Sequence, residues 1–145
     1  MPPGLQFLSV RGNRLVGIGF LAGLDHLRSV DVSANDLLRL DEHVFSRRIR
    51  SPPPPPISAN FSRNEIASVD GRAFAGVAFS VLDVTGNQLT RLSVGGASAV
   101  GVLRADDNHI RDVDDDVFRS TRDLHVADNR LRSLRTSRSP ETVSK

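Results

Sequence analysis

Acidic, histidine and arginine side chains gather between residues 83 and 128, and these residue types could support chemistry. Among the acids of this stretch are Asp83, Asp106, Asp107, Asp123 and Asp128, and it also contains Arg104, His109 and His125. Carboxylates and imidazoles suit zinc or calcium as ligands, and they also serve as general acids and bases. Whether they form a site depends on the elements that carry them.

A repeated pattern of apolar residues carries these side chains. The clearest copy, FSVLDVTGNQLTRL at residues 79–92, has the apolar residues Phe79, Leu82, Val84, Leu89 and Leu92. Residues around Val84 alternate between apolar and polar, which predicts a strand with Leu82 and Val84 directed inward. Asn87 follows this strand, where its amide can bond both the turn and a neighbouring coil.

The same spacing occurs six times along the chain. Six of the seven asparagines occupy the equivalent place, one in each copy: Asn13, Asn35, Asn64, Asn87, Asn108 and Asn129. The third copy is degenerate at its start, with Pro56 in the first apolar position. Self-similarity at a period of 20–50 residues is the signature of solenoids, in which each coil contacts only its neighbours. We therefore predict an α/β solenoid with a parallel sheet.

The repeated phrase L-x-x-L-x-L-x-x-N-x-L is followed in three copies by a phenylalanine, at Phe45, Phe74 and Phe118. In this respect the chain resembles the typical leucine-rich repeats of animal extracellular proteins, such as Toll-like receptor ectodomains, chaoptin, Slit and the small leucine-rich proteoglycans. The resemblance implies a horseshoe that binds proteins. Its concave face would be the parallel sheet, and its convex side would hold irregular or short helical segments.

The repeats are expected to cover residues 1–134. A proline-rich insertion near residues 47–57 interrupts them, and five consecutive prolines there favour polyproline II, so this segment should bulge from the solenoid. Residues 135–145 are polar and carry no repeat, and we expect a disordered tail. Cysteine-bearing caps are absent, so we expect the chain to be a fragment of a longer array.

Outward-directed strand residues predict polar rows across the sheet. One row is Ser9, Asp31, Asn60, Asp83, Arg104 and His125. Another row consists of the residues directly before the repeated asparagines: Gly12, Ala34, Arg63, Gly86, Asp107 and Asp128. We hypothesise that this face binds a protein through Asp31, Asp83, Arg104, Asp106, Asp107, His125 and Asp128. Because acids dominate its C-terminal half, the expected partner is basic.

An open sheet is a poor place for a metal or a catalytic centre. Neighbouring strands are about 4.8 Å apart, so these carboxylates and histidines would neither converge on an ion nor exclude water. We expect no enzyme activity, no metal and no cofactor. The run Asp114–Asp116 is expected to be a solvated turn or a helix start, where acids suit the helix dipole.

Composition narrows the partners further. A net charge of +2 gives no reason to expect nucleic acid, and no apolar run reaches the roughly 18 residues of a membrane span. The expected function is a protein-binding module of a cell-surface or secreted adhesion or receptor protein. The alternative is an intracellular scaffold or regulatory subunit of the same fold, which the absence of cysteine also suits. Asn60-Phe61-Ser62 is a possible N-glycosylation site, and a sugar there would cover part of the face.

Overall fold

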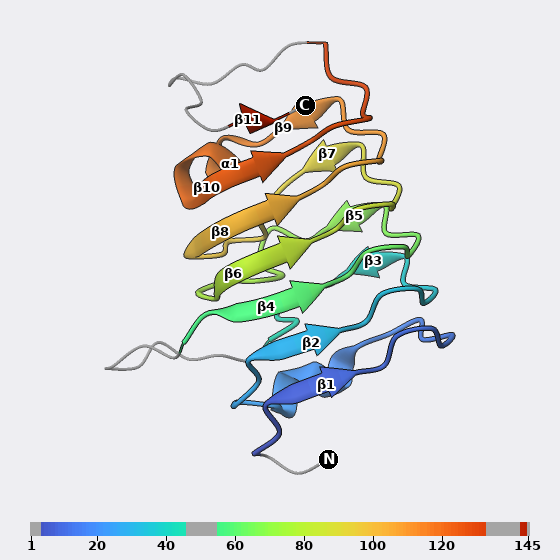
Figure 1. The fold of residues 1–145 in the computed structure, drawn as a ribbon, viewed down its shortest axis with the longest axis vertical. Helices are drawn as coiled ribbons and strands as arrows, with labels where there is room; N and C mark the ends of the chain where they lie inside the picture. The colour runs from blue at the N-terminus through green and yellow to red at the C-terminus, as the bar shows by residue number, and fades with distance from the viewer. Residues whose placement is uncertain (1–3, 46–54, 133–142, 145) are drawn as a thin grey trace.

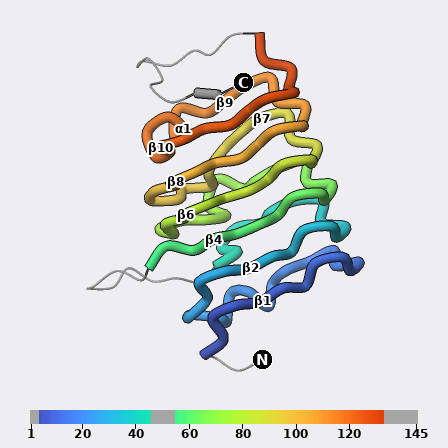
Figure 2. The backbone as a smooth tube through the Cα atoms, viewed as in Figure 1, coloured from blue at the N-terminus to red at the C-terminus, as the bar shows by residue number. Residues whose placement is uncertain are grey.

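A computed structural model describes residues 4–45, 55–132 and 143–144, and these residues wind into a parallel β-solenoid (Figures 1 and 2). Successive coils stack along the long axis of the molecule, and each coil contributes one strand to the same sheet. The prediction of a solenoid with a parallel sheet is confirmed.

The main sheet holds seven parallel strands, which lie side by side in chain order. They are β1 (Phe7–Ser9), β2 (Ser29–Asp31), β4 (Ile57–Asn60), β6 (Ala78–Asp83), β8 (Ala99–Arg104), β10 (Thr121–His125) and β11 (Val143–Ser144). The first six come from the repeats. The last comes from the predicted tail, where Val143 pairs with Leu124.

The register of the sheet follows the apolar pattern of the sequence. Leu8, Val30, Ala59, Leu82, Leu103 and Leu124 are consecutive partners across the six repeat strands. All but Leu8 of the first coil are buried. A shift by one residue would turn each apolar side chain to the opposite face, so burial of this row fixes the register.

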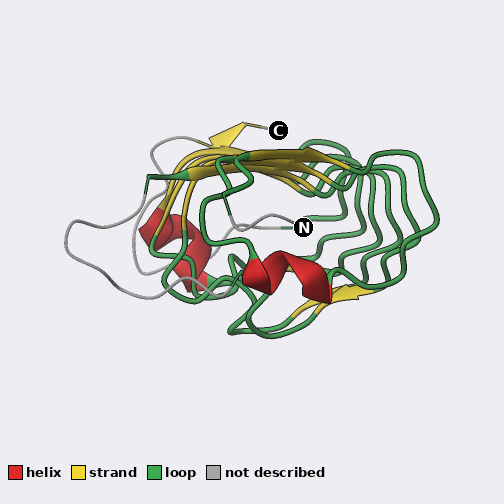
Figure 3. Cartoon of the chain, turned by 90° about the horizontal axis from the view of Figure 1, so that it is seen from below, coloured by secondary structure: helices red, strands yellow, loops and turns green. Residues whose placement is uncertain are grey.

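The back of the solenoid, opposite the main sheet, consists mostly of turns and two short strand pairs (Figure 3). Strand β3 (Arg39–Leu40) pairs with β5 (Ser68–Val69), and β7 (Arg91–Leu92) pairs with β9 (Asp112–Val113). Helix within the described ranges is confined to a 3-10 turn, η1 (Gly19–Gly23), and to α1 (Asp115–Ser120). The helix start predicted at Asp114–Asp116 is confirmed.

The assignment of Pro56 to the first apolar position of the third coil is wrong. Pro56 is exposed, and the apolar position facing Phe79 belongs instead to Ile57, which is fully buried. The register shifts between Ile57 and Ser58, whose partners are Phe79 and Val81, so β4 crosses this point with one residue fewer than β6 before the regular pairing resumes. Proline has no N–H for the ladder, and the extra residue in β6 lets Ile57 pair with Phe79 and enter the core instead.

Aromatic rings fill the core of the third and fourth coils. Phe74 lies 6.1 Å from Phe45, 5.9 Å from Phe61 and 5.0 Å from Phe79 between ring centroids. The expected phenylalanine row thus begins at Phe45 and Phe74. Phe118 is half-buried against the core, and Ala97 occupies the intervening position in the fourth coil.

Most of the proline-rich insertion lies outside the described residues, and so does the tail apart from Val143 and Ser144. Within the described ranges, no helix is both long enough and apolar enough to cross a bilayer.

Candidate functional site

The predicted asparagines join each coil to the next. The side-chain oxygen of Asn87 accepts a 3.0 Å hydrogen bond from the Ile66 N–H, and its Nδ2 donates to the carbonyls of Phe61 and Val84. Asn35, Asn64, Asn108 and Asn129 repeat this arrangement. Asn13, in the first coil, bonds only locally, to Val10 and Arg11. We call these six residues the asparagine ladder.

The residue before each ladder asparagine has a left-handed backbone. Gly12 and Gly86 have φ values of 75° and 70°, and Ala34, Arg63, Asp107 and Asp128 have values of 55° to 56°. This conformation turns the chain out of the strand and presents the asparagine amide to the preceding coil. Sequence reasoning missed it because Ala34 and Arg63 belong to types that seldom adopt such a conformation.

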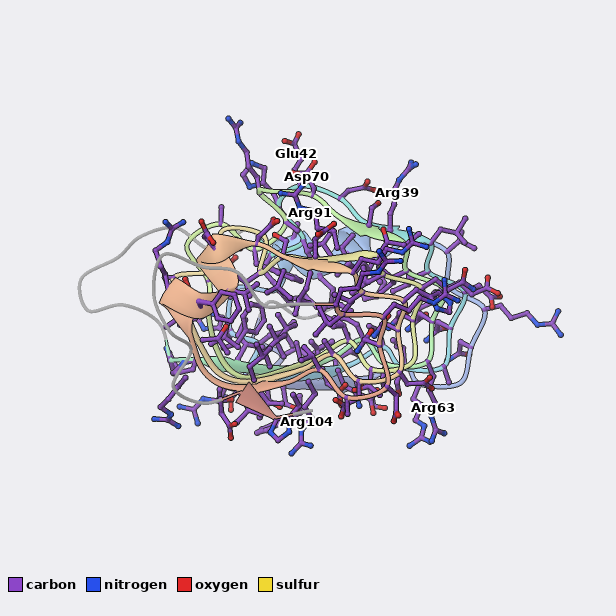
Figure 4. The ribbon with its side chains drawn as sticks, turned by 90° about the horizontal axis from the view of Figure 1, so that it is seen from above. Arg39, Glu42, Arg63, Asp70, Arg91 and Arg104 are labelled. Atoms are coloured by element: carbon purple, nitrogen blue, oxygen red, sulfur yellow. The ribbon has the colours of Figure 1, made fainter. Side chains whose placement is uncertain are left out.

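The outward side chains of the six repeat strands and of the turns that follow them form what we call the sheet face. The row Ser9, Asp31, Asn60, Asp83, Arg104 and His125 lies in continuous register. Arg63 and Arg104 both project from this side of the molecule (Figure 4). The sequence therefore predicted correctly that the residues of this row are neighbours across the sheet.

Three members of this row have structural partners. The carboxylate oxygen of Asp31 accepts from the Ser33 N–H at 2.9 Å and from its hydroxyl. Asn60 and Asp83 accept in the same way from the Ser62 and Thr85 amides, each at 2.9 Å. These bonds satisfy strand-end amides. The type and position of Asp31 and Asp83 are thus explained by the turn, and the D-x-[S/T] spacing was the signal for it.

The acidic side chains of the last two coils differ in whether a hydrogen-bond or ion-pair partner engages their carboxylates. Asp106 accepts from the Ala127 N–H at 2.7 Å, and His125 Nε2 lies 3.5 Å from Asp123. Asp107 and Asp128 are exposed, and neither has an ion pair within the described part of the chain. They occupy equivalent positions in adjacent coils, so they form the freest pair of negative charges on the sheet face.

Asn60 lies within β4, between Asp31 and Asp83 in the row, and its side chain is half-buried. Its Oδ1 is held by the Ser62 amide, so the nitrogen that would carry a sugar is oriented by the turn. A sugar on this nitrogen would lie over the centre of the sheet face.

A second acidic group, on the back of the solenoid, borders a cavity of about 480 Å³ that sequence reasoning did not foresee. Asp114 pairs with Arg91 across coils, and this contact raises the Arg91 pKa. Burial is the main reason that the pKa of Asp116 is raised, and the negative charge of Asp114 adds to it. In the chain as described, no group of three or more histidine, cysteine or acidic side chains could hold a metal ion.

No protein-family model and no curated protein sequence matches the chain. The sheet face and the hydrogen bonds behind it are therefore the basis for assigning a function.

Proposed function

We propose that this chain is a leucine-rich-repeat module that binds a basic protein partner on the sheet face, as part of a cell-surface or secreted adhesion or receptor protein. The repeat spacing supports the leucine-rich-repeat assignment. The asparagine ladder supports it as well, because each amide joins two coils in the same way.

The observation that carries the binding proposal is the exposed pair Asp107 and Asp128, in the turns that follow β8 and β10. These side chains have no ion pair within the described residues that would occupy their charge. Complementary charge on a partner would steer association and fix its orientation. Phe7, at the opposite end of the face, is 66% exposed and offers an aromatic contact of the kind that interfaces favour.

The proposal excludes Asp31 and Asp83 as primary contacts, because their carboxylates are engaged in their own turns. Their contribution is to hold the strand ends in place. Of the seven predicted contact residues, Arg104, Asp107 and Asp128 are therefore the principal contacts in this proposal.

An array of secreted proteins and receptor ectodomains, probed with the intact chain, tests the binding function. The double variant Asp107→Asn/Asp128→Asn should bind its array partners about tenfold more weakly, since it removes both free charges. The matched control Asp25→Asn/Asp112→Asn removes two exposed charges away from the sheet face and should bind as the wild type does. Equal affinity of the sheet-face variant, or an array without any binder, would contradict the proposal.

The compartment needs a separate test. Surface biotinylation of cells that express the natural gene should label the endogenous protein, detected by an antibody to this chain. Recovery of the protein only from the unlabelled cytosolic fraction would favour the scaffold alternative instead.

A further inference from the structure

Strand β3 has an open edge on the back of the solenoid. The carbonyls of Leu40 and of Leu38, just before the strand, accept from the Asp70 and Ala67 amides of the third coil at 2.9 Å each. Backbone groups alternate in direction along a strand, so the N–H and C=O of Arg39 are directed the other way, toward the first coil. No backbone hydrogen bond between residues 16–24 and residues 37–45 occurs in the described structure.

The first coil leaves this edge open because it turns away. Gly17 and Ile18 occupy the places equivalent to Arg39 and Leu40 but form no strand. Ile18 accepts from the Leu21 N–H at 3.0 Å, and η1 begins directly after it. Gly17 and Gly19 flank Ile18 and present no side chain to fill the space. In Figure 1, β3 has β5 on one side and only the loop of the first coil on the other.

A cavity of about 250 Å³ lies between the first coil and β3. Its lining includes Val16 and Leu38, which are 74% and 59% exposed and are two of the three large apolar side chains that the described surface exposes. The cavity is smaller than a typical drug-sized ligand site and suits one or two side chains of a peptide. An open strand edge beside exposed aliphatic groups is the arrangement used in strand addition.

The charges around the cavity select the peptide. Arg39 and Asp41 form an ion pair at 3.0 Å, so their charges offset each other. Glu42 also lines the cavity, is exposed and has no ion pair in the described ranges, which leaves a net negative charge beside the apolar groups. Figure 4 shows Arg39 and Glu42 on the side of the molecule opposite Arg104.

We propose that this cavity is a second binding site, distinct from the sheet face, where an extended peptide with alternating aliphatic residues and a basic flank adds to β3. Its backbone pairs with the N–H and C=O of Arg39. An aliphatic side chain contacts Val16 and Leu38, and a lysine or arginine pairs with Glu42. The site does not depend on the sheet face, which lies on the other side of the coil.

Titration of the isotope-labelled full chain with synthetic peptides, followed by amide chemical shifts, tests the proposal. The probe is acetyl-Lys-Val-Thr-Val-Lys-amide. We expect saturable shifts centred on the Arg39 amide and slower hydrogen exchange there. A peptide with proline at the central position cannot donate at that point and should bind at least about tenfold more weakly. The acidic counterpart, with glutamate at both ends, should also be weaker.

Two variants complete the test. Gly17→Leu fills the cavity, and its backbone has open space for a side chain, so the variant should fold and lose peptide binding. Gly23→Leu, in the same coil but away from the cavity, has equal space and should bind as the wild type does. Absence of shifts at Arg39, equal binding of the proline peptide, tighter binding of the acidic peptide, or full binding by Gly17→Leu would each overturn the proposal. The sheet-face variant Asp107→Asn/Asp128→Asn should bind the peptide normally.

Discussion

The side-chain oxygen of Asn87 and the backbone N–H of Ile66 form a 3.0 Å hydrogen bond between two coils, in a part of the protein that water does not reach. The same amide donates to Phe61, Val84 and Thr85. One side chain thus satisfies backbone groups from its own coil and from the preceding one. The ladder of such residues is the main polar link through the interior of the solenoid.

Replacing Asn87 with alanine should therefore destabilise the protein strongly. The substitution leaves a buried N–H and several carbonyls without partners, which we expect to lower the free energy of unfolding by about 3 kcal/mol. Urea unfolding monitored by circular dichroism measures the change. Asn13→Ala is the matched control: Asn13 is exposed and bonds only within its own turn, so its loss should cost about 1 kcal/mol or less. Equal losses at the two positions would contradict this account.

Gly101 provides a test of how closely β8 and β6 approach each other. A Cβ atom at this position would lie 2.6 Å from the carbonyl oxygen of Ser80, in the backbone of the neighbouring strand. Gly101→Ala should lower the free energy of unfolding by about 1–3 kcal/mol, as overpacking does. Gly71→Ala meets nothing within 4 Å and should be nearly neutral. Thermal unfolding of both variants distinguishes the two positions, and a neutral Gly101→Ala would show that the strands can separate freely.

The turn after β2 predicts a difference between two substitutions of Asp31. Asp31→Ala removes the acceptor for the amide and hydroxyl of Ser33, a residue that is only 2% exposed. We expect a loss of about 1–2 kcal/mol for this variant. Asp31→Asn keeps an acceptor oxygen and should lose less than half as much, although both variants remove the same charge. If the two variants were equally destabilised, the charge of Asp31 rather than its hydrogen bonds would be the stabilising feature.

Asp116 should make stability depend on pH. Burial raises its pKa in the folded state, so the folded chain retains a proton that the unfolded chain has released. Stability consequently falls as the pH rises from the unfolded-state pKa to the folded-state pKa, and it stays lower above that range. Asp116→Asn should be more stable than the wild type at neutral pH, and this advantage should shrink on acidification to about pH 3.

Chemical unfolding at neutral and acidic pH measures this effect. Asp115→Asn, which changes an exposed neighbour in the same helical turn, should bring no gain in stability at neutral pH. A gain from Asp116→Asn that is the same at both pH values would mean that ionisation of Asp116 is not its source.

The repeat pattern predicted the architecture well because burial of one apolar row fixes both the strands and their register. The ladder asparagines were equally visible, since a polar residue recurring inside an apolar frame needs a structural partner. The turn hydrogen bonds of Asp31 and Asp83 were not predicted, because outward position alone does not separate a side chain that bonds its own turn from one that is free for a partner.

Other features depended on backbone geometry that residue types specify weakly. The left-handed turn includes Ala34 and Arg63, and the pairing of β3 with β5 involves only two residues of each strand. Proline in the third coil concealed the register shift after Ile57. The cavity beside β3 arises because Gly17 and Ile18 form no strand and η1 begins directly after them, and the glycines around Ile18 indicated only a loose turn.

Steric blocking of the sheet face tests the central claim most directly. The chain has no cysteine, so a single introduced cysteine can be labelled selectively with a polyethylene glycol maleimide. Arg104 and Asp70 are both exposed and project from opposite sides of the molecule (Figure 4). We predict that labelled Arg104→Cys loses binding to its ectodomain partner, while labelled Asp70→Cys and unlabelled Asp70→Cys bind equally well. Retained binding by labelled Arg104→Cys would contradict the assignment of the sheet face as the binding surface.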